Sequence, residues 1–313
     1  VLDMTKEYGL VFDGGGARGA YQIGAWKALR EAGVKISAVA GTSVGALNGA
    51  LVCMGDVKKA EEIWSEITFS KVMDVEDEWM ERLFRRETPV REILNELWGK
   101  LKEGGVDITP LKKLIHEMID EEAIRTSEVE FFLLTFSVTE MKELDLALED
   151  IPEGLLEDFL LASAYLLGFK NEPLHGKTYL DGGVVNNVPL GSLVKRGYEN
   201  VIEVRIYGPG REPKVRMPQS GEKYVIAPRV KLGSIIEFSE KRSRQNLKIG
   251  YFDAKRMLYG LEGTIYYLEQ THEDAYYEEL LSGLRDMEKA EIAFQLKLSF
   301  ASSEKELYLG MLE

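Results

Sequence analysis

The chain has 313 residues, with 39 Lys or Arg against 53 Asp or Glu, which gives a formal net charge of −14. The length allows one large domain or two small ones, and 45% hydrophobic residues exclude a disordered chain. A charge of −14 would repel phosphate backbones, so nucleic acid is not expected as a partner. The single Cys53 excludes an internal disulfide and a cysteine-rich zinc site.

The N-terminal elements predict a βαβ unit. A short apolar run at 8–12 stops at a glycine cluster and predicts a buried strand, 20–32 predicts a helix, and 36–40 predicts a second strand. The two strands should be parallel, with both faces of their sheet covered by helices. A helix of small residues is predicted to follow at 44–54.

The remaining elements complete a three-layer α/β/α arrangement with a mostly parallel central sheet. Helices are predicted through most of 58–126 and at 153–165, 189–196, 235–260 and 272–300, and strands at 130–139, 144–148, 178–180 and 201–207, the last in the chain, with a strand or edge left open at 263–268. The turn-rich stretch that begins at Gly208 predicts a boundary between an N-terminal α/β domain of residues 1–207 and a mainly helical C-terminal extension, residues 208–313, packed on it.

The uncharged run from Ile36 to Gly55 has the length of a membrane span, but its four glycines and its polar residues argue against insertion. No signal peptide is recognisable at the start of the chain. We therefore expect a cytoplasmic protein, with peripheral contact at membranes left open and the oligomeric state unknown.

A glycine loop follows the first predicted strand, at Gly14, Gly15, Gly16 and Gly19. A dinucleotide site would need an acidic residue about 20 positions further on, and none is present there; a phosphate loop would need a Gly-Lys-Ser/Thr ending. Backbone amides without side chains before a helix instead suit a developing negative charge, such as an oxyanion. A tight turn with packing glycines is the alternative.

The second motif is Gly-Thr-Ser-Val-Gly at 41–45, between a predicted strand and a predicted helix. This context suits a nucleophile elbow, because Gly41 and Gly45 permit the strained turn that exposes the Ser43 hydroxyl. The amide of Val44 would then lie beside the attacked carbonyl. A structural serine in a glycine-rich turn is the alternative.

The third motif, Asp181-Gly182-Gly183, follows a short predicted strand. The two glycines would allow the backbone beside the carboxylate to approach another loop closely. Taken alone, Asp-Gly-Gly is also a common turn.

In combination and in this order, the three motifs resemble the patatin-like phospholipase family over about residues 6–207. The resemblance implies a lipid acyl ester as substrate and a Ser–Asp dyad, with Ser43 as nucleophile and Asp181 as proton acceptor. It also implies an oxyanion hole around Gly14, Gly15 and Gly16, in a loop that includes Arg18 and Gly19, and it requires no metal or cofactor. Ala162-Ser163 fits the family's usual approach to the aspartate motif.

Two alternatives remain open at this point. A Ser-His-Asp esterase of the α/β-hydrolase type would need His175 or His272, although each is more simply a loop or surface residue. A lipid- or nucleotide-binding module would keep the glycine loop without turnover. A dyad with a little-perturbed Asp181 predicts that kcat/KM falls at about pH 4 to 5.

Three further segments have a lipid-related hypothesis beside a structural one. Residues 78–86 suit an interfacial or lid helix or, alternatively, a packed amphipathic helix. Core packing is the main alternative to an acyl pocket lined by Leu155, Phe159, Leu160, Tyr165 and Leu166. A solvated helix face is the alternative to a phosphate-attracting group formed by Lys241, Arg242, Arg244 and Lys248.

Overall fold

The computed structural model describes residues 2–85, 104–164, 170–263 and 271–295, with isolated positions between 92 and 99. Its contacts divide the chain into two compact units. The larger unit is Asp3–Ala254, and the other contains the first two residues with Lys255–Glu313. All three sequence motifs lie in the larger unit.

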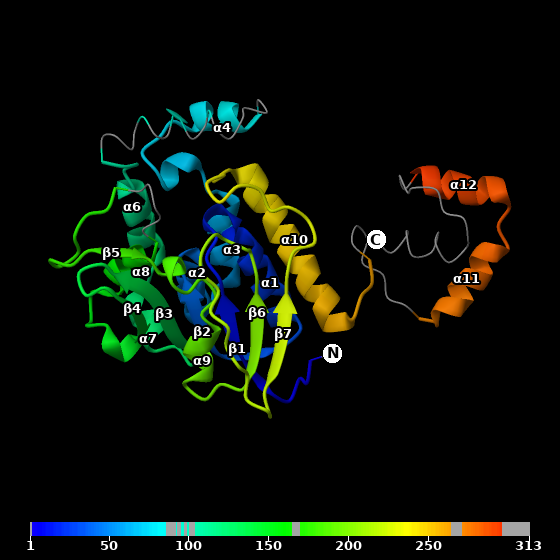
Figure 1. Cartoon of the computed structure of the whole chain (residues 1–313), viewed down its shortest axis with the longest axis horizontal. Coiled ribbons are helices and arrows are strands. Elements are labelled where there is room, and N and C mark those ends of the chain that lie inside the picture. The colour runs from blue at the N-terminus through cyan, green and yellow to red at the C-terminus, as the bar shows by residue number, and fades with distance from the viewer. Residues whose placement is uncertain are drawn as a thin grey trace. The chain divides into compact units, whose positions relative to one another are not determined.

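Seven strands in the described part of the chain form one central sheet (Figure 1). They are β1 (Glu7–Phe12), β2 (Lys35–Thr42), β3 (Glu130–Ser137), β4 (Lys142–Ala147), β5 (Tyr179–Asp181), β6 (Asn200–Val204) and β7 (Glu222–Ile226). The order is β4-β3-β2-β1-β6-β7, with β5 paired to β3. The neighbouring strands β3-β2, β2-β1, β1-β6 and β6-β7 pair in parallel, whereas β4 and β5 run antiparallel to β3. The predicted, mostly parallel sheet is confirmed.

Helices cover both faces of this sheet (Figure 1). On one face Ala38 and Ala40 pack in a cluster with α9 (Leu190–Val194). On the other face Val39 lies against α2 (Val44–Met54), because neighbouring residues of a strand point to opposite faces. Burial on both sides explains why these strands are almost continuously apolar.

The other helices of the larger unit agree with the predicted positions, although their ends differ by up to five residues. They are α1 (Ala20–Glu31), α3 (Val57–Ser65), α4 (Asp77–Arg85), α6 (Thr109–Met118), α7 (Glu121–Arg125), α8 (Leu156–Ser163) and α10 (Glu240–Tyr259), which continues into the second unit. The uncharged run at 36–55 forms β2 and α2. No helix among the described residues is long and apolar enough to cross a membrane.

The prediction that 201–207 holds the last strand was wrong, because β7 pairs in parallel with β6. β7 is an edge strand whose residues alternate between more and less exposed positions. It follows a stretch rich in Gly and Pro, which concealed its short pattern. A functional boundary after residue 207 stays a prediction, and the compact unit itself continues to Ala254.

The second unit contains α11 (Asp274–Ser282) and α12 (Asp286–Gln295). Leu281 of α11 is buried and packs against partly buried neighbours that include Tyr277 and Ile292. The predicted helical character of 272–295 is confirmed. Residues 264–268 and 296–300, for which a strand and further helix were predicted, lie outside the described residues.

Candidate active site

Ser43 forms the sharp turn between β2 and α2. Its backbone has a φ of 57° and is left-handed, a conformation that non-glycine residues rarely adopt and that occurs at functional sites. The Ser43 amide donates a hydrogen bond of 2.9 Å to Oγ of Ser163, and the Ser163 hydroxyl donates to the carbonyl of Leu134. The last residue of α8 therefore holds the strained turn against β3.

Gly45 allows this turn to lie at the end of β1. A Cβ atom at this position would collide with the carbonyl of Phe12 and would lie 2.8 Å from that of Asp13. The second glycine of the motif is thus required by close approach of α2 to the backbone of a neighbouring strand.

Strand β3 brings Asp181 to Ser43. Thr42, the last residue of β2, is paired with Leu134, and Asp181 is paired with the next residue, Thr135. Because β4 already occupies the other edge of β3 over these residues, β5 lies on the edge that β2 uses. The turn that carries Ser43 and the Asp181 carboxylate thus reach consecutive positions of one strand edge.

The carboxyl group of Asp181 is buried, with 5% of the residue exposed. Oδ1 accepts the amide of Gly183 at 2.8 Å, whereas Oδ2 is buried and makes no hydrogen bond of ordinary geometry. The Ser43 side chain lies near enough to interact with the carboxyl group. Burial raises the pKa of Asp181 to about 6, and the interactions with Ser43 and Gly183 oppose this rise.

In the glycine loop, the backbone amides of two of the three predicted oxyanion donors have no hydrogen-bond partner among the residues that the structure describes. The amide of Gly14 donates to the carbonyl of Asn187 at 3.2 Å, while the amides of Gly15 and Gly16 make no hydrogen bond in the structure. The Val44 amide lies in the first turn of α2, where amides have no partner within the helix. Free amides are therefore present on two sides of the turn that carries Ser43.

Asn187 joins this loop to the loop after Asp181, and the sequence analysis assigned it no role. It is 1% exposed, and its Nδ2 donates to the carbonyls of Gly14 and Gly208, at 3.3 and 3.1 Å. A Cβ atom at Gly14 or at Gly183 would lie 2.5 or 2.6 Å from its Oδ1. Both loops therefore pack against this one side chain.

Arg18 and Asp13 attach the glycine loop to the chain beyond β6. Nε of Arg18 donates to the carbonyl of Gly233, and Nη1 donates to those of Ile206 and Tyr207. The Asp13 carboxylate accepts the amides of Ile206 and Tyr207 at 2.8 and 3.0 Å. The guanidinium of Arg18 is thus bonded to backbone carbonyls.

The three histidines form their hydrogen bonds with residues other than Ser43 and Asp181. His175 lies 2.7 Å from Asp158, and His116 lies 3.0 Å from Glu157, with both histidine side chains more than half exposed. The ring of His272 belongs to the second unit. No hydrogen bond joins the first two rings to Ser43 or Asp181.

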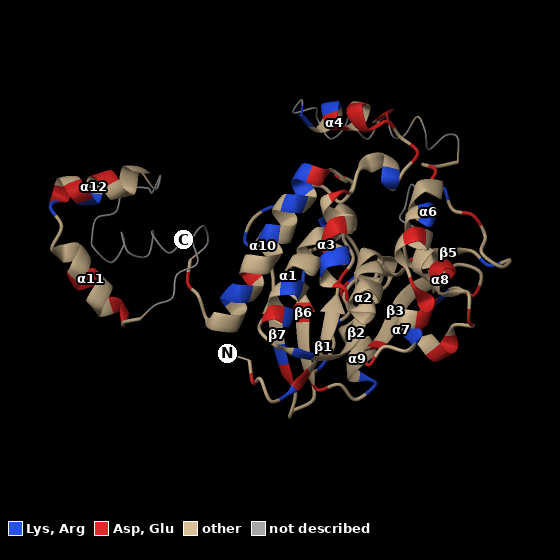
Figure 2. Ribbon diagram, turned by 180° about the vertical axis from the view of Figure 1, so that it is seen from behind, with Lys and Arg blue, Asp and Glu red and all other residues tan. Residues whose placement is uncertain are grey.

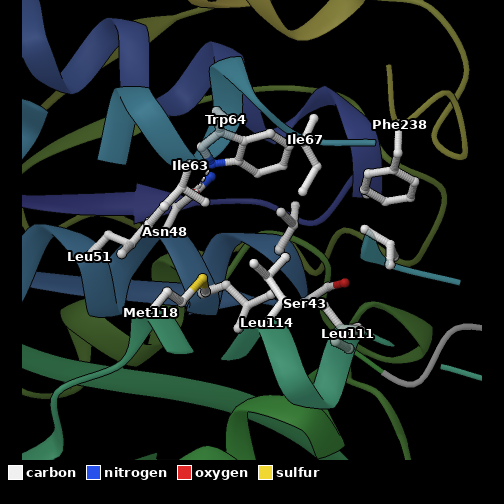
Figure 3. Close-up of a pocket in the computed structure, with 15 residues that line it drawn as sticks. Ser43, Asn48, Leu51, Ile63, Trp64, Ile67, Leu111, Leu114, Met118 and Phe238 are labelled. Atoms are coloured by element: carbon white, nitrogen blue, oxygen red, sulfur yellow. Dashed lines mark hydrogen bonds between the residues drawn. The ribbon is translucent and has the colours of Figure 1, made fainter. Parts of the chain in front are cut away.

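An apolar pocket begins at Ser43 and is formed by the facing sides of α2, α3 and α6 (Figure 3). Its wall includes Leu47 and Leu51 of α2, and Trp64 of α3. The indole Nε1 of Trp64 donates to Oδ1 of Asn48 at 2.8 Å, so the polar atoms of the wall satisfy one another. Gly19 lies behind the wall, where a Cβ atom would come within 2.7 Å of the Trp64 ring.

This pocket is not the one the sequence suggested. Leu155, Phe159 and Leu160 are absent from its lining, and Leu160 is fully buried, as core packing requires. The other two suggested residues, Tyr165 and Leu166, lie outside the described residues.

A polar cavity of about 790 Å³ shares Phe238 with the apolar pocket. It lies between α4 and the start of α10, where basic residues recur along the helix (Figure 2). Arg242 is 3.3 Å from Glu237, and Arg244 is 3.7 Å from Glu240. The predicted cationic group is thus interleaved with carboxylates.

A strained serine between strand and helix, beside a buried carboxylate and free backbone amides, is typical of serine hydrolases built on a parallel α/β sheet. Residues 10–194 match the Patatin-like phospholipase family, and the chain belongs to that family.

Two relatives and one solved structure extend the comparison. Neuropathy target esterase sws of Drosophila melanogaster is 28% identical over 201 residues, which are 63% of this chain and 13% of that protein. The Drosophila grimshawi protein of that name is 31% identical over 184 residues, 58% of this chain and 11% of its own length. The crystal structure of VipD from Legionella pneumophila has a TM-score of 0.50 at 15% identity and covers 93% of this chain and 76% of VipD. The chain spans about an eighth of the esterases, and VipD shares its fold.

Proposed function

We propose that this chain is a lipid acyl hydrolase with Ser43 as nucleophile and Asp181 as proton acceptor. The observation that carries the proposal is the convergence of β2 and β5 on consecutive residues of β3, which brings the Ser43 hydroxyl beside a buried carboxylate. The family match and the esterase names of the relatives support the reaction class.

In the first half of the reaction, Asp181 accepts the proton of Ser43 as Oγ attacks the ester carbonyl. A free aspartate is about 2.6 pK units less basic than a free histidine. The raised pKa of about 6 removes most of that difference, while Asp181 remains mainly ionised at pH 7. The amides of Gly15 and Gly16, with that of Val44, would stabilise the oxyanion.

The first half ends when protonated Asp181 gives its proton to the leaving alcohol, and the acyl group stays on Ser43 as an ester. In the second half, Asp181 accepts a proton from water, whose oxygen attacks the acyl carbonyl. Collapse of this intermediate releases the fatty acid and returns the proton to Ser43. The apolar pocket beside Ser43 supplies a site for the acyl chain.

Labelling with a fluorophosphonate tests the nucleophile. We expect the wild type to be labelled and Ser43→Ala to be unlabelled, whereas Ser192→Ala, at a buried serine bonded to Asp145, should be labelled normally. Hydrolysis of soluble p-nitrophenyl esters should follow the same pattern. An unlabelled, inactive wild type would favour the binding module, and loss of activity in His175→Ala or His272→Ala would favour the histidine-dependent esterase.

A further inference from the structure

Resting on the proposed function, we propose that the apolar pocket selects short to medium acyl chains. Its optimum is an acyl group of about six to eight carbons, and its upper limit is about ten. The inference deepens the substrate class of the Ser43 site and comes from the length and the closed end of the pocket.

The length of the pocket follows from the spacing of its lining residues along two helices. Along α2, the lining runs from Ser43 to Leu51, and (51 − 43) residues at a rise of 1.5 Å give about 12 Å. Along α6 it runs from Leu111 to Met118, and (118 − 111) residues give about 10.5 Å. In Figure 3, Ser43 and Leu111 lie at one end, and Leu51 and Met118 lie at the other.

The far end is closed by packed side chains. Leu51 is 3% exposed and Met118 is 6% exposed, so neither borders solvent to a significant extent. Nζ of Lys59, on α3, donates to the carbonyl of Met118 at 3.4 Å, which joins α3 to the end of α6. A longer chain must therefore displace packed residues at this end.

The side walls are also fixed. The Asn48 amide that accepts from Trp64 donates through Nδ2 to the carbonyl of Gly19 and to Oε1 of Gln22, each at 2.9 Å. All four residues belong to one buried network between α1, α2 and α3. Widening the pocket at Trp64 would break hydrogen bonds without water to replace them.

The shorter of the two helix lengths sets the optimum. At roughly 1.3 Å per carbon, an acyl group of six to eight carbons extends about 8 to 10 Å. Such a group ends within the span from Leu111 to Met118 of α6, which is about 10.5 Å long. It therefore fills the pocket without reaching beyond its far end.

The helix lengths set the upper limit. A hydrocarbon chain with bonds of about 1.5 Å advances roughly 1.3 Å per carbon, so about 12 Å corresponds to nine or ten carbons. Chains between the two limits require only adjustment of flexible side chains such as Met118. Chains beyond ten carbons must leave the pocket or force its end apart.

The test is the chain-length dependence of kcat/KM for p-nitrophenyl esters with 4, 6, 8, 10, 12 and 16 carbons, below their aggregation concentrations. Each methylene buried in the pocket should raise kcat/KM by up to about four-fold, until the pocket is full. We expect a maximum at six to eight carbons and a fall of at least about ten-fold at sixteen. A value that rises without a break to sixteen carbons would overturn the inference.

Variants of the lining residues test whether the chain-length selectivity comes from this pocket. Leu51→Ala and Met118→Ala should each move the maximum to chains two to four carbons longer, and Leu47→Phe should move it to four carbons. Leu29→Ala, at a buried leucine of α1 outside the lining, should leave the maximum in place. An unchanged maximum in folded Leu51→Ala and Leu47→Phe, with thermal melting as the check, would refute the inference while the hydrolase remains. Absence of both ester hydrolysis and fluorophosphonate labelling in the wild type would instead refute the proposed function.

Discussion

The two sides of Ser43 are built in opposite ways. On one side, backbone amides, Asp181 and Asn187 form a polar group whose atoms are held by hydrogen bonds between loops. On the other side, the faces of α2, α3 and α6 form an apolar pocket. Hydrogen bonds fix directions, whereas apolar packing fixes volume, so we expect the polar side to control the rate of the chemical step and the pocket to control which acyl chain is accepted.

The largest effect should follow from Asp181→Asn. The amide keeps an oxygen for the Gly183 hydrogen bond but cannot accept the Ser43 proton, so kcat should fall by at least about 10³-fold. KM and the preferred chain length should change little. Steady-state kinetics across the ester series checks this separation of the two sides, and a fall in kcat of less than ten-fold would exclude Asp181 as the base.

Asn187→Ala should have the next largest effect. It removes the hydrogen bonds to Gly14 and Gly208, which join the loop after Asp181 to the glycine loop and to the chain after β6. We expect kcat to fall by about 10- to 100-fold with KM nearly unchanged. Asn200→Ala, at the start of β6, is the matched control. A larger rise in KM than fall in kcat, in a variant that melts like the wild type, would show that Asn187 serves binding instead.

The pH dependence tests the environment of Asp181. Because the carboxylate is the active form, kcat/KM should fall about ten-fold per pH unit below pH 6, which is higher than the pH 4 to 5 expected for a little-perturbed aspartate. The limb should persist in His175→Ala and His272→Ala. A limb near 6.5 that disappears in either variant would contradict the dyad.

The same raised pKa predicts a smaller effect on stability. The folded state holds the Asp181 proton more tightly than the unfolded state, so this contribution to stability is present below about pH 4 and is lost as pH rises through about 6. Asp181→Asn should therefore be more stable than wild type by up to roughly 3 kcal/mol at pH 7.5, with little difference at pH 3.5. Denaturant unfolding at both pH values provides the measurement. If the variant and the wild type differ in free energy of unfolding by the same amount at both pH values, the pKa of Asp181 is not raised by burial.

The smallest effect is expected at membranes. Trp79 and Phe84 of α4 are only partly exposed, and the Phe84 ring stacks on Phe69 at 5.6 Å, so much of this apolar surface is already packed. We expect Trp79→Ala and Phe84→Ala to reduce co-sedimentation with liposomes by only a few-fold. Unchanged binding in both variants would end the interfacial role of α4 and leave its packing role.

The sequence indicated which residues lie on the polar side, whereas it did not indicate the lining of the apolar side. Ser43, Asp181 and the glycine loop lie in short motifs whose residue types are tied to turn geometry, although their catalytic roles stay predictions. Asn187 carries no such signal, because its role depends on loops that meet only in the folded chain.

The pocket could not be located from the sequence for a related reason. Leu155 and its neighbours were a possible lining, with core packing as the main alternative, but the observed lining comes from α2, α3 and α6. The apolar face of a helix looks the same in sequence whether it borders a cavity or the core. Only the packing of three helices distinguishes the two.

The pairing of β5 has an evolutionary consequence. Three residues, Tyr179–Asp181, pair with β3, and side chains alternate along a strand. An insertion or deletion that moved this pairing by one residue would turn the Asp181 carboxylate to the opposite face of the sheet. In an evolving family, such a shift of register would separate the carboxylate from Ser43, while the apolar pocket, lined mainly by α2, α3 and α6, would stay in place.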